Sequence, residues 1–307
     1  MLHRSFVISI LCFMPAGPLT ADESPSSGSL QEIVVTATLR PVPALDLPAS
    51  VTVLDEQTLR AAGVQHWQDV LPLVPNLNWA SGSSRPRYFQ LRGIGETDQW
   101  QGAPNPSVGF LIDGMDFSGI GMPATLLDLG QAEVLRGPQG TTLGANALAG
   151  LINLTTRRPE LAPELRLEAT GGSEDTRSLG LVVGGALAES SETAWRAVMQ
   201  RYRSDGSRRN VTVGRDDTNG LDETTLRARL GTRLADRWRA DVSALWGDMD
   251  NGFDGFAIDN SRRTRSDDPG RDAQRSRGVS ATLVRSGEQI EFRSQTALVA
   301  ADITYSF

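Results

Sequence analysis

The chain has 307 residues, enough for two domains, of which 39% are hydrophobic and 22% charged. Its formal net charge of -7 argues against a nucleic-acid partner. There is one cysteine, Cys12, and there are two histidines, His3 and His66. Cys12 and His3 lie in a predicted leader, so the exported chain would have no disulfide, no cysteine metal site and no catalytic histidine other than His66.

Residues 1–21 have the form of a signal peptide. A basic start is followed by an apolar run over residues 6–14, then by Pro15 and small residues. We predict cleavage after Ala21, with Ala16 as the alternative. Because proline ends a helix, these residues are poorly suited to a buried first helix, and the pattern predicts export.

A short β-prone run follows the leader. Residues 22–31 are rich in Ser, Pro and Gly, which predicts a flexible linker. Residues 32–38 then read Glu-Ile-Val-Val-Thr-Ala-Thr and stand alone between that linker and Pro41. A strand without a neighbour close in sequence pairs with a distant segment or with another protein.

Residues 44–159 mix short strands and helices, which predicts an α+β domain. Asp55 is expected to cap a helix over residues 56–62, which Gly63 ends. A further helical turn is expected over residues 67–71. Short strands are predicted at residues 50–54, 89–92, 108–112, 132–135 and 150–155.

Beyond residue 159 the sequence alternates with a period of two. Leu226, Ala228 and Leu230 alternate with Arg227 and Arg229, which gives one apolar and one basic face. Short turns and one long polar loop, over residues 247–277, favour an outer-membrane barrel, with a soluble β-sandwich as the alternative. About seven strands are expected, over residues 164–172, 177–187, 192–203, 226–234, 238–246, 278–285 and 289–299.

Three segments together resemble the TonB-dependent receptors. Residues 32–38 resemble the TonB box, and residues 91–95 read Leu-Arg-Gly-Ile-Gly. The most specific match is Phe-Leu-Ile-Asp-Gly at residues 110–114, followed by residues 133–141 and 144–153, although Leu143 stands where the family usually has an aromatic residue. The resemblance is dense over about residues 32–159 and looser beyond.

The resemblance implies an α+β plug domain followed by antiparallel transmembrane β-barrel strands. Residues 22–43 would be a linker with the TonB box at 32–38, residues 44–159 the plug, and residues 160–307 the N-terminal portion of the barrel. Because the family's barrel has 22 strands, we expect the barrel to be incomplete. A plug about 34 Å across does not fit in a barrel of about eight strands, so the chain is expected not to transport alone.

The TonB box would add as a strand to the sheet of TonB. An N-terminal strand tucked into the plug is the alternative. The residues expected to bind TonB are Glu32, Ile33, Val34, Val35, Thr36 and Ala37.

By resemblance, Arg92 and Arg136 would pair with carboxylates on the inner barrel wall. The ligand would contact apical plug loops at residues 81–87 and 96–106. The candidates there are Arg85, Arg87, Trp100 and Gln101.

The function implied is active uptake of a scarce nutrient, by default an iron–siderophore complex, through the outer membrane of a Gram-negative bacterium. Expected partners are TonB with its inner-membrane energising complex, outer-membrane lipid and an extracellular small molecule, but no nucleic acid. Alternatives are a receptor for cobalamin, haem or an oligosaccharide, and a non-transporting fragment that binds TonB. No enzyme chemistry, cofactor or metal is predicted.

Overall fold

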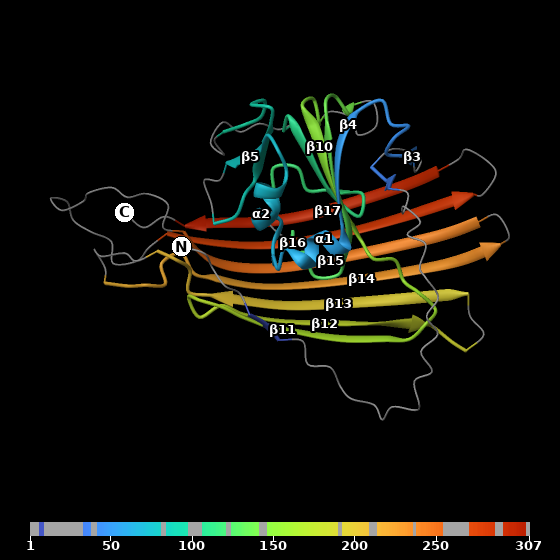
Figure 1. The fold of residues 1–307 in the computed structure, drawn as a ribbon. Helices are drawn as coiled ribbons and strands as arrows, with labels where there is room; N and C mark the ends of the chain where they lie inside the picture. The colour runs from blue at the N-terminus through green and yellow to red at the C-terminus, as the bar shows by residue number, and fades with distance from the viewer. Residues whose placement is uncertain are drawn as a thin grey trace, which may run out of the picture.

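The computed structural model describes residues 6–8, 33–37, 42–80, 84–97, 106–120, 124–140, 146–189, 192–208, 214–235, 238–253, 270–285 and 291–304. Figure 1 shows two parts: a plug layer, made by residues 33–156, and a long curved sheet, the wall sheet, on which it lies.

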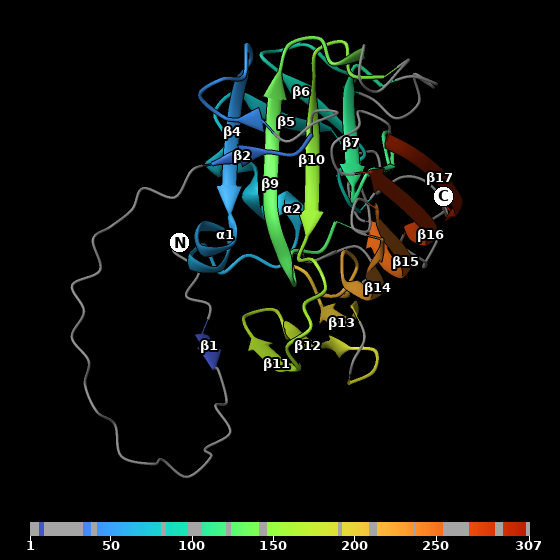
Figure 2. The same ribbon diagram turned by 90° about the vertical axis from the view of Figure 1, so that its right-hand side faces the viewer.

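The plug layer is built on a mixed sheet whose strands stand side by side in Figure 2. β10 pairs with β7 in parallel, and the other pairs are antiparallel. The strand order is β4 (Ser50–Asp55), β9 (Leu129–Arg136), β10 (Gly150–Thr156), β7 (Val108–Ile112) and β8 (Met115–Asp116). Two smaller antiparallel pairs join β2 (Val34–Val35) to β3 (Val42–Pro43) and β5 (Leu77–Ala80) to β6 (Tyr88–Leu91).

Side chains cap both short helices. α1 (Glu56–Ala61) begins where Asp55 Oδ1 accepts a hydrogen bond from Thr58 N at 2.8 Å, which confirms the predicted cap. α2 (Trp67–Val70) is capped by His66, whose Nδ1 accepts from Gln68 N at 3.1 Å. A 3₁₀ turn, η1 (Leu71–Leu73), follows. His66 therefore has a structural role as a helix cap.

Two of the motif segments contain tight turns. Asp113 and Gly114, between β7 and β8, have φ angles of 48° and 77°. Arg92 and Gly93 have φ angles of 53° and 79° and join Leu91 to Ile94. Both central residues need positive φ in a type I′ turn, which explains why each pair ends in glycine.

A hydrophobic core holds the plug layer together. The rings of Phe89 and Phe110 stack with their centroids 5.2 Å apart. Trp67, Met115 and Phe117 pack in the same cluster and are at most 1% exposed. Each buried aromatic side chain removes a large apolar area from water, so these residues contribute strongly to the stability of the core.

The wall sheet contains all seven strands expected from the alternating pattern, and every neighbouring pair is antiparallel. The expected polar loop at 247–277 is wrong in its bounds, because β15 continues to Phe253 and β16 begins at Gly270. The strands are β11 (Glu164–Gly171), β12 (Arg177–Ala186), β13 (Thr193–Ser204), β14 (Leu221–Ala235), β15 (Trp238–Phe253), β16 (Gly270–Arg285) and β17 (Glu291–Thr304).

Of the predicted signal peptide, the structure describes only β1 (Phe6–Ile8), which pairs with β11 at the edge of the wall sheet. The predicted cleavage position at Ala21 lies outside the described residues. In the described part of the chain no helix is long and apolar enough to cross a membrane.

Candidate functional site

Residues 33–37, the described part of the predicted TonB box, are docked on the plug layer. β2 pairs with β3, and Val35 is fully buried. Ile33, at the start of the segment, is 52% exposed. The side chains that pack with Val35 in one apolar cluster are Ala37, Leu111, Leu135 and Leu151.

Glu133, on β9, binds the backbone of this segment. Its Oε1 accepts from Thr36 N at 2.6 Å and from Thr36 Oγ1 at 2.8 Å, and its Oε2 accepts from Ala37 N at 2.7 Å. Asn153 Nδ2 donates to Oε2 at 3.1 Å, and Gln131 Nε2 donates to Oε1 at 2.6 Å. Glu133 is fully buried, so these donors replace the water that its carboxylate has lost.

The expectation that this segment has no pairing neighbour close in sequence is therefore wrong for residues 33–37, because β3 pairs with β2 and Glu133 binds the backbone of Thr36 and Ala37. The alternative, a strand tucked into the plug, describes the structure. Glu32 and Thr38 lie outside the described residues. The binding of TonB by this segment stays a prediction.

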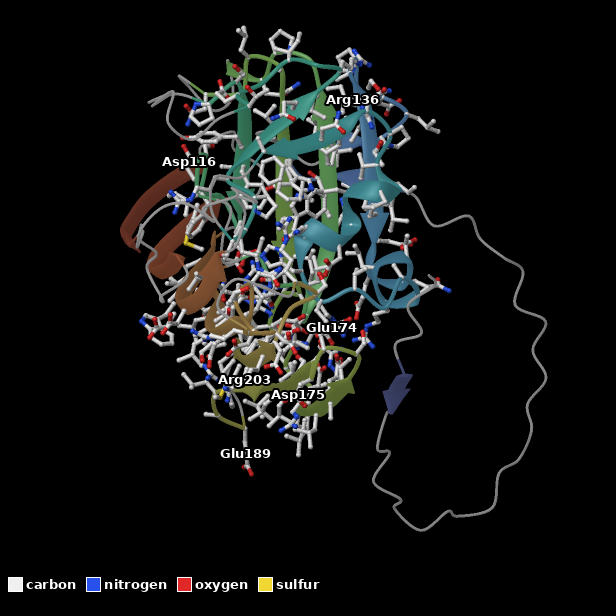
Figure 3. The ribbon with its side chains drawn as sticks, turned by 90° about the vertical axis from the view of Figure 1, so that its left-hand side faces the viewer. Asp116, Arg136, Glu174, Asp175, Glu189 and Arg203 are labelled. Atoms are coloured by element: carbon white, nitrogen blue, oxygen red, sulfur yellow. The ribbon has the colours of Figure 1, made fainter. Side chains whose placement is uncertain are left out.

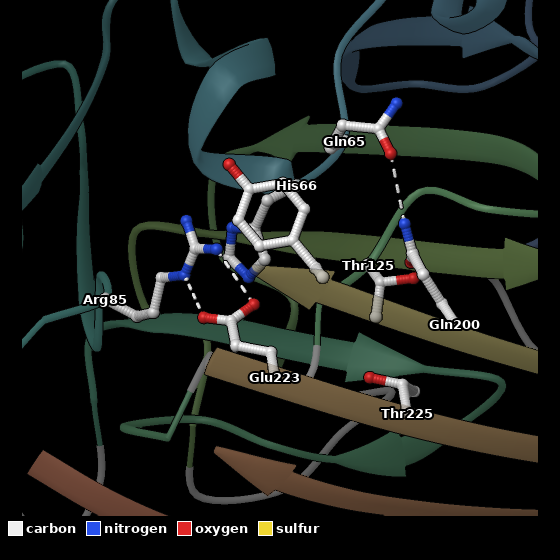
Figure 4. Close-up of a pocket in the computed structure, with 8 residues that line it drawn as sticks. Gln65, His66, Arg85, Thr125, Gln200, Glu223 and Thr225 are labelled. Atoms are coloured by element: carbon white, nitrogen blue, oxygen red, sulfur yellow. Dashed lines mark hydrogen bonds and ion pairs between the residues drawn. The ribbon is translucent and has the colours of Figure 1, made fainter. Parts of the chain in front are cut away.

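A buried ion pair joins the plug layer to the wall sheet (Figure 4). Arg85 Nε and Nη2 donate to the two carboxylate oxygens of Glu223, on β14, at 2.7 and 2.8 Å. Asn251, on β15, donates to Glu223 Oε1 at 2.8 Å. The side chains of Arg85 and Glu223 are only 5% and 7% exposed. Burial lowers the pKa of Arg85, but the charge and hydrogen bonds of Glu223 outweigh it and raise that pKa, so the guanidinium keeps its charge.

A second contact reverses the polarity, with an acid on the plug layer and arginines on the wall. Arg196, on β13, donates from Nε and Nη2 to the two oxygens of Asp128, both at 2.6 Å. Arg166, on β11, donates to Asp128 Oδ1 at 2.7 Å. Arg196 also binds Glu164 at 2.7 Å. The forked geometry of Arg196 fixes orientation as well as distance.

A third contact uses the first of the two tight turns. Asp113 accepts from Thr156 N at 2.9 Å and Thr156 Oγ1 at 2.7 Å. Arg229 Nη1, on β14, donates to Thr156 O at 2.7 Å and to Asp113 Oδ1 at 3.2 Å. Its neighbour on the same face, Arg227, donates to the backbone oxygen of Leu127. The basic face of β14 therefore meets the plug layer.

The two arginines predicted to contact the barrel lie elsewhere. Arg92 is exposed in its turn. Arg136 donates to Thr52 Oγ1 at 2.8 Å and to Pro75 O at 3.0 Å, within the plug layer, and lies toward the end of that layer away from the wall sheet (Figure 3). Burial and the nearby charge of Arg92 lower the pKa of Arg136. Among the described residues the structure brings neither guanidinium to a wall carboxylate, and their pairing with the barrel stays a prediction, whereas Arg85 does make such a contact.

The structure describes two of the four predicted ligand-facing residues, Arg85 and Arg87. Arg85 is buried in its ion pair, and Arg87 is half-buried. Trp100 and Gln101 lie outside the described residues. Glu133 and Asp113 had no predicted role, although both stand within the motif segments. An acidic residue between the apolar neighbours Ala132 and Val134 was the available signal for a buried carboxylate.

A small cavity lies between the two layers, beside the Arg85–Glu223 pair (Figure 4). Gln65, His66 and Thr125 line it from the plug layer, and Gln200 and Glu223 from the wall. Its volume is about 10 Å³, roughly the room that one water molecule needs. Thr125 Oγ1 and Gln200 Oε1 are buried without a hydrogen-bond partner within the described part of the chain. The interface is therefore polar and loosely filled at this point.

Comparison with known proteins agrees with this architecture. Residues 43–151 match the model of the TonB-dependent Receptor Plug Domain. A pesticin receptor of Yersinia enterocolitica serotype O:8 is 30% identical over 172 residues, which are 56% of this chain and 25% of that protein. The vitamin B12 transporter BtuB of Photobacterium profundum is 25% identical over 247 residues, or 80% of this chain and 39% of that one.

The fold also matches a solved receptor. The pyoverdine outer-membrane receptor FpvA of Pseudomonas aeruginosa has a TM-score of 0.68 at 20% identity, covering 91% of this chain and 41% of that chain. The chain thus spans about a quarter to two fifths of the length of these relatives. The family is not enzymatic, in agreement with the prediction. The chain therefore contains a TonB-dependent receptor plug domain and is homologous, over part of their length, to the TonB-dependent outer-membrane receptors.

Proposed function

We propose that the chain supplies the plug and part of the wall of an outer-membrane receptor that imports a scarce nutrient with energy delivered through TonB. The observation that carries the proposal is the plug-domain match at residues 43–151 directly after an extended, β-prone segment. In this role residues 32–38 leave the plug layer and add as a strand to TonB. The predicted signal peptide and the outer-membrane relatives support the location.

The interface between the layers supports a plug that is held firmly but can be moved. Its polar contacts are concentrated at three clusters, centred on Asp113, Asp128 and Glu223. Beside the Glu223 cluster, Thr125 Oγ1 and Gln200 Oε1 at the cavity have no hydrogen-bond partner among the residues that the structure describes. Hydrogen-bonded ionic contacts fix one arrangement of the layers, and their charged groups can return to water when the layers separate.

For the nutrient we propose an iron–siderophore complex, with cobalamin as the alternative. The pyoverdine receptor supports the first by its fold, and the vitamin B12 transporter supports the second because it matches 80% of the chain. Growth of iron-starved cells on ferric siderophores, set against cobalamin-dependent growth, separates the two. Growth on neither would overturn both assignments.

The TonB step is tested by proline substitution in the full-length receptor. Val34→Pro removes a backbone donor from the segment and blocks its addition to a sheet edge. Uptake should fall at least about tenfold, the effect of losing roughly 1.4 kcal/mol, whereas binding of the nutrient to the cell surface should persist. Unchanged uptake would sink the assignment of residues 32–38.

The matched control is Val42→Ala. The substitution removes side-chain packing at the position of β3 that pairs with Val35, so it weakens docking of the segment. The backbone of the segment itself is unchanged. Uptake by this variant should stay at the parent level. Equal losses in Val34→Pro and Val42→Ala would mean that docking on the plug, and not strand addition, is what uptake requires.

A further inference from the structure

We infer that Glu133 competes directly with TonB for residues 33–37 and so sets how often the segment is free to bind. Its carboxylate occupies the backbone amides of Thr36 and Ala37, which a partner strand would need. The inference rests on the proposed function, because it presumes that TonB binds this segment by strand addition. It adds a specific residue that controls that binding from inside the plug.

The docked segment has few free backbone groups left for a partner. Thr36 N and Ala37 N donate to Glu133. On the carbonyl side, Ile33 O accepts from Ala44 N at 2.8 Å and Val34 O accepts from Gln131 Nε2 at 2.8 Å. A sheet edge pairs through these same groups, so docking and strand addition exclude each other.

Glu133 is held in place for this contact by the rigid centre of the plug sheet. It lies on β9, between β4 and β10, and is fully buried. Asn153, on β10, and Gln131, on β9, each donate to one of its oxygens. Thr155 Oγ1 lies 3.2 Å from Thr36 Oγ1 and completes the polar pocket. Because the pocket is preorganised, the segment loses little of the hydrogen-bond energy to rearrangement of its partners.

A purely structural role for Glu133 would look different. A carboxylate that only supported β9 and β10 would accept hydrogen bonds from residues of those strands alone. Gln131 and Asn153 are donors of that kind. Its shortest backbone contacts, at 2.6 and 2.7 Å, go instead to residues nearly a hundred positions earlier in the chain. Charged hydrogen bonds are among the stronger ones in proteins, so Glu133 stabilises the docked state of the segment.

The consequence is a lowered apparent affinity for TonB. When a partner binds only the undocked form, the measured dissociation constant is the intrinsic one divided by the undocked fraction. Weakening the Glu133 contact should therefore strengthen TonB binding in the absence of nutrient. The gain should be about tenfold, corresponding to about 1.4 kcal/mol.

The test variant is Glu133→Gln in the full-length receptor. Glutamine keeps the shape, but its amide nitrogen must face Ala37 N, Gln131 Nε2 or Asn153 Nδ2, all of which are donors. Glu133→Asp, which keeps the charge but shortens the side chain, should give an intermediate effect and guards against misfolding of the first variant. Asp116→Asn is the matched control, because Asp116 Oδ1 also accepts from a backbone amide of the plug, that of Ser118.

Two readouts are needed. A nitroxide label on Ile33→Cys reports docking directly, since Ile33 is half exposed and the chain's one natural cysteine, Cys12, lies in the predicted leader. Binding of the C-terminal domain of TonB reports the competition. The motion of the label should be slow in the parent and in Asp116→Asn, and fast in Glu133→Gln. TonB should bind Glu133→Gln about tenfold more tightly than it binds the parent.

Equal label mobility or equal TonB affinity in the parent and Glu133→Gln would overturn the competition while leaving the proposed function standing. Absence of TonB binding in every variant would overturn the proposed function itself, and the competition with it. The two failures are therefore distinguishable.

Discussion

At the interface of the two layers, buried charged side chains bind each other and no longer contact water. Arg85 and Glu223 are both almost completely buried, and each satisfies the other's charge with two hydrogen bonds. Removing two charges from water costs as much as such a pair regains, so the pair adds little net stability. What it supplies is one allowed position of the plug layer on β14.

This distinction leads to a prediction for single and double substitutions. Arg85→Leu or Glu223→Leu alone leaves one buried charge without its partner and should destabilise the seated plug by about 3 to 5 kcal/mol. The double substitution should recover most of that loss. Thermal unfolding of the purified receptor measures both effects. A double variant as unstable as the worse single one would show that the pair itself, and not the stranded charge, carries the energy.

At the scale of elements, the cap of α1 depends on pH. Hydrogen bonds from the side chain and backbone of Thr58 lower the pKa of Asp55. Its contribution to stability is therefore fully present above the pKa of the unfolded chain and is lost as the pH falls through the lower folded-state pKa. Asp55→Ala should destabilise α1 by about 1 kcal/mol at neutral pH, and the difference should shrink below about pH 4.

Hydrogen exchange of the α1 amides at the two pH values measures this effect. Asp55→Asn is the control, because asparagine caps helices about as well as aspartate but does not titrate. It should stay close to the parent at neutral pH. A loss in Asp55→Ala that persisted unchanged in acid would mean that the carboxylate is not the capping group.

The seven wall strands could be predicted because one face of each is regularly apolar, but their ends could not. β14 begins at Leu221 and not near Leu226, since its first inward residues, Glu223 and Thr225, are buried polar side chains. The end of β15 could not be predicted for the same reason, because its inward residue Asn251 is a buried polar side chain. Where a strand faces a polar partner, the alternation that identifies it disappears.

The docking of residues 33–37 lay beyond sequence reasoning for a related cause. Val34 and Val35 identify an extended segment, but nothing local states whether it is paired. Its partners, Gln131 and Glu133, lie almost a hundred residues later in the chain. Arg92 shows what a motif position leaves open: the structure shows the turn that Arg92 forms with Gly93, and the contact of its guanidinium with a barrel carboxylate stays a prediction.

For the molecule as a whole, the basic face predicted for the wall meets acids of the plug. Arg166, Arg196 and Arg229 reach Asp128 and Asp113 across the interface. Apolar contacts through described side chains span the two layers at two places: Leu245, on β15, packs with the core cluster of the plug layer, and Leu127 packs with Val182 and Val198. Shape at the cluster of Leu127, Val182 and Val198 should therefore help to set how closely the layers approach.

The last prediction concerns that approach. Gly180, on β12, lies beneath Leu127, and a Cβ added there would come within 2.8 Å of Leu127 Cδ2. Because the end of a leucine side chain can move, Gly180→Ala should be tolerated, with a cost of about 1 kcal/mol. Gly180→Phe cannot be accommodated by rotation alone and should lift the plug layer from the wall.

In the full-length receptor, Gly180→Phe should increase passive entry of antibiotics. Ala228→Phe, on the exposed face of β14, is the matched control and should not leak. Equal permeability in Gly180→Phe and the parent would show that this contact does not set the spacing of the layers.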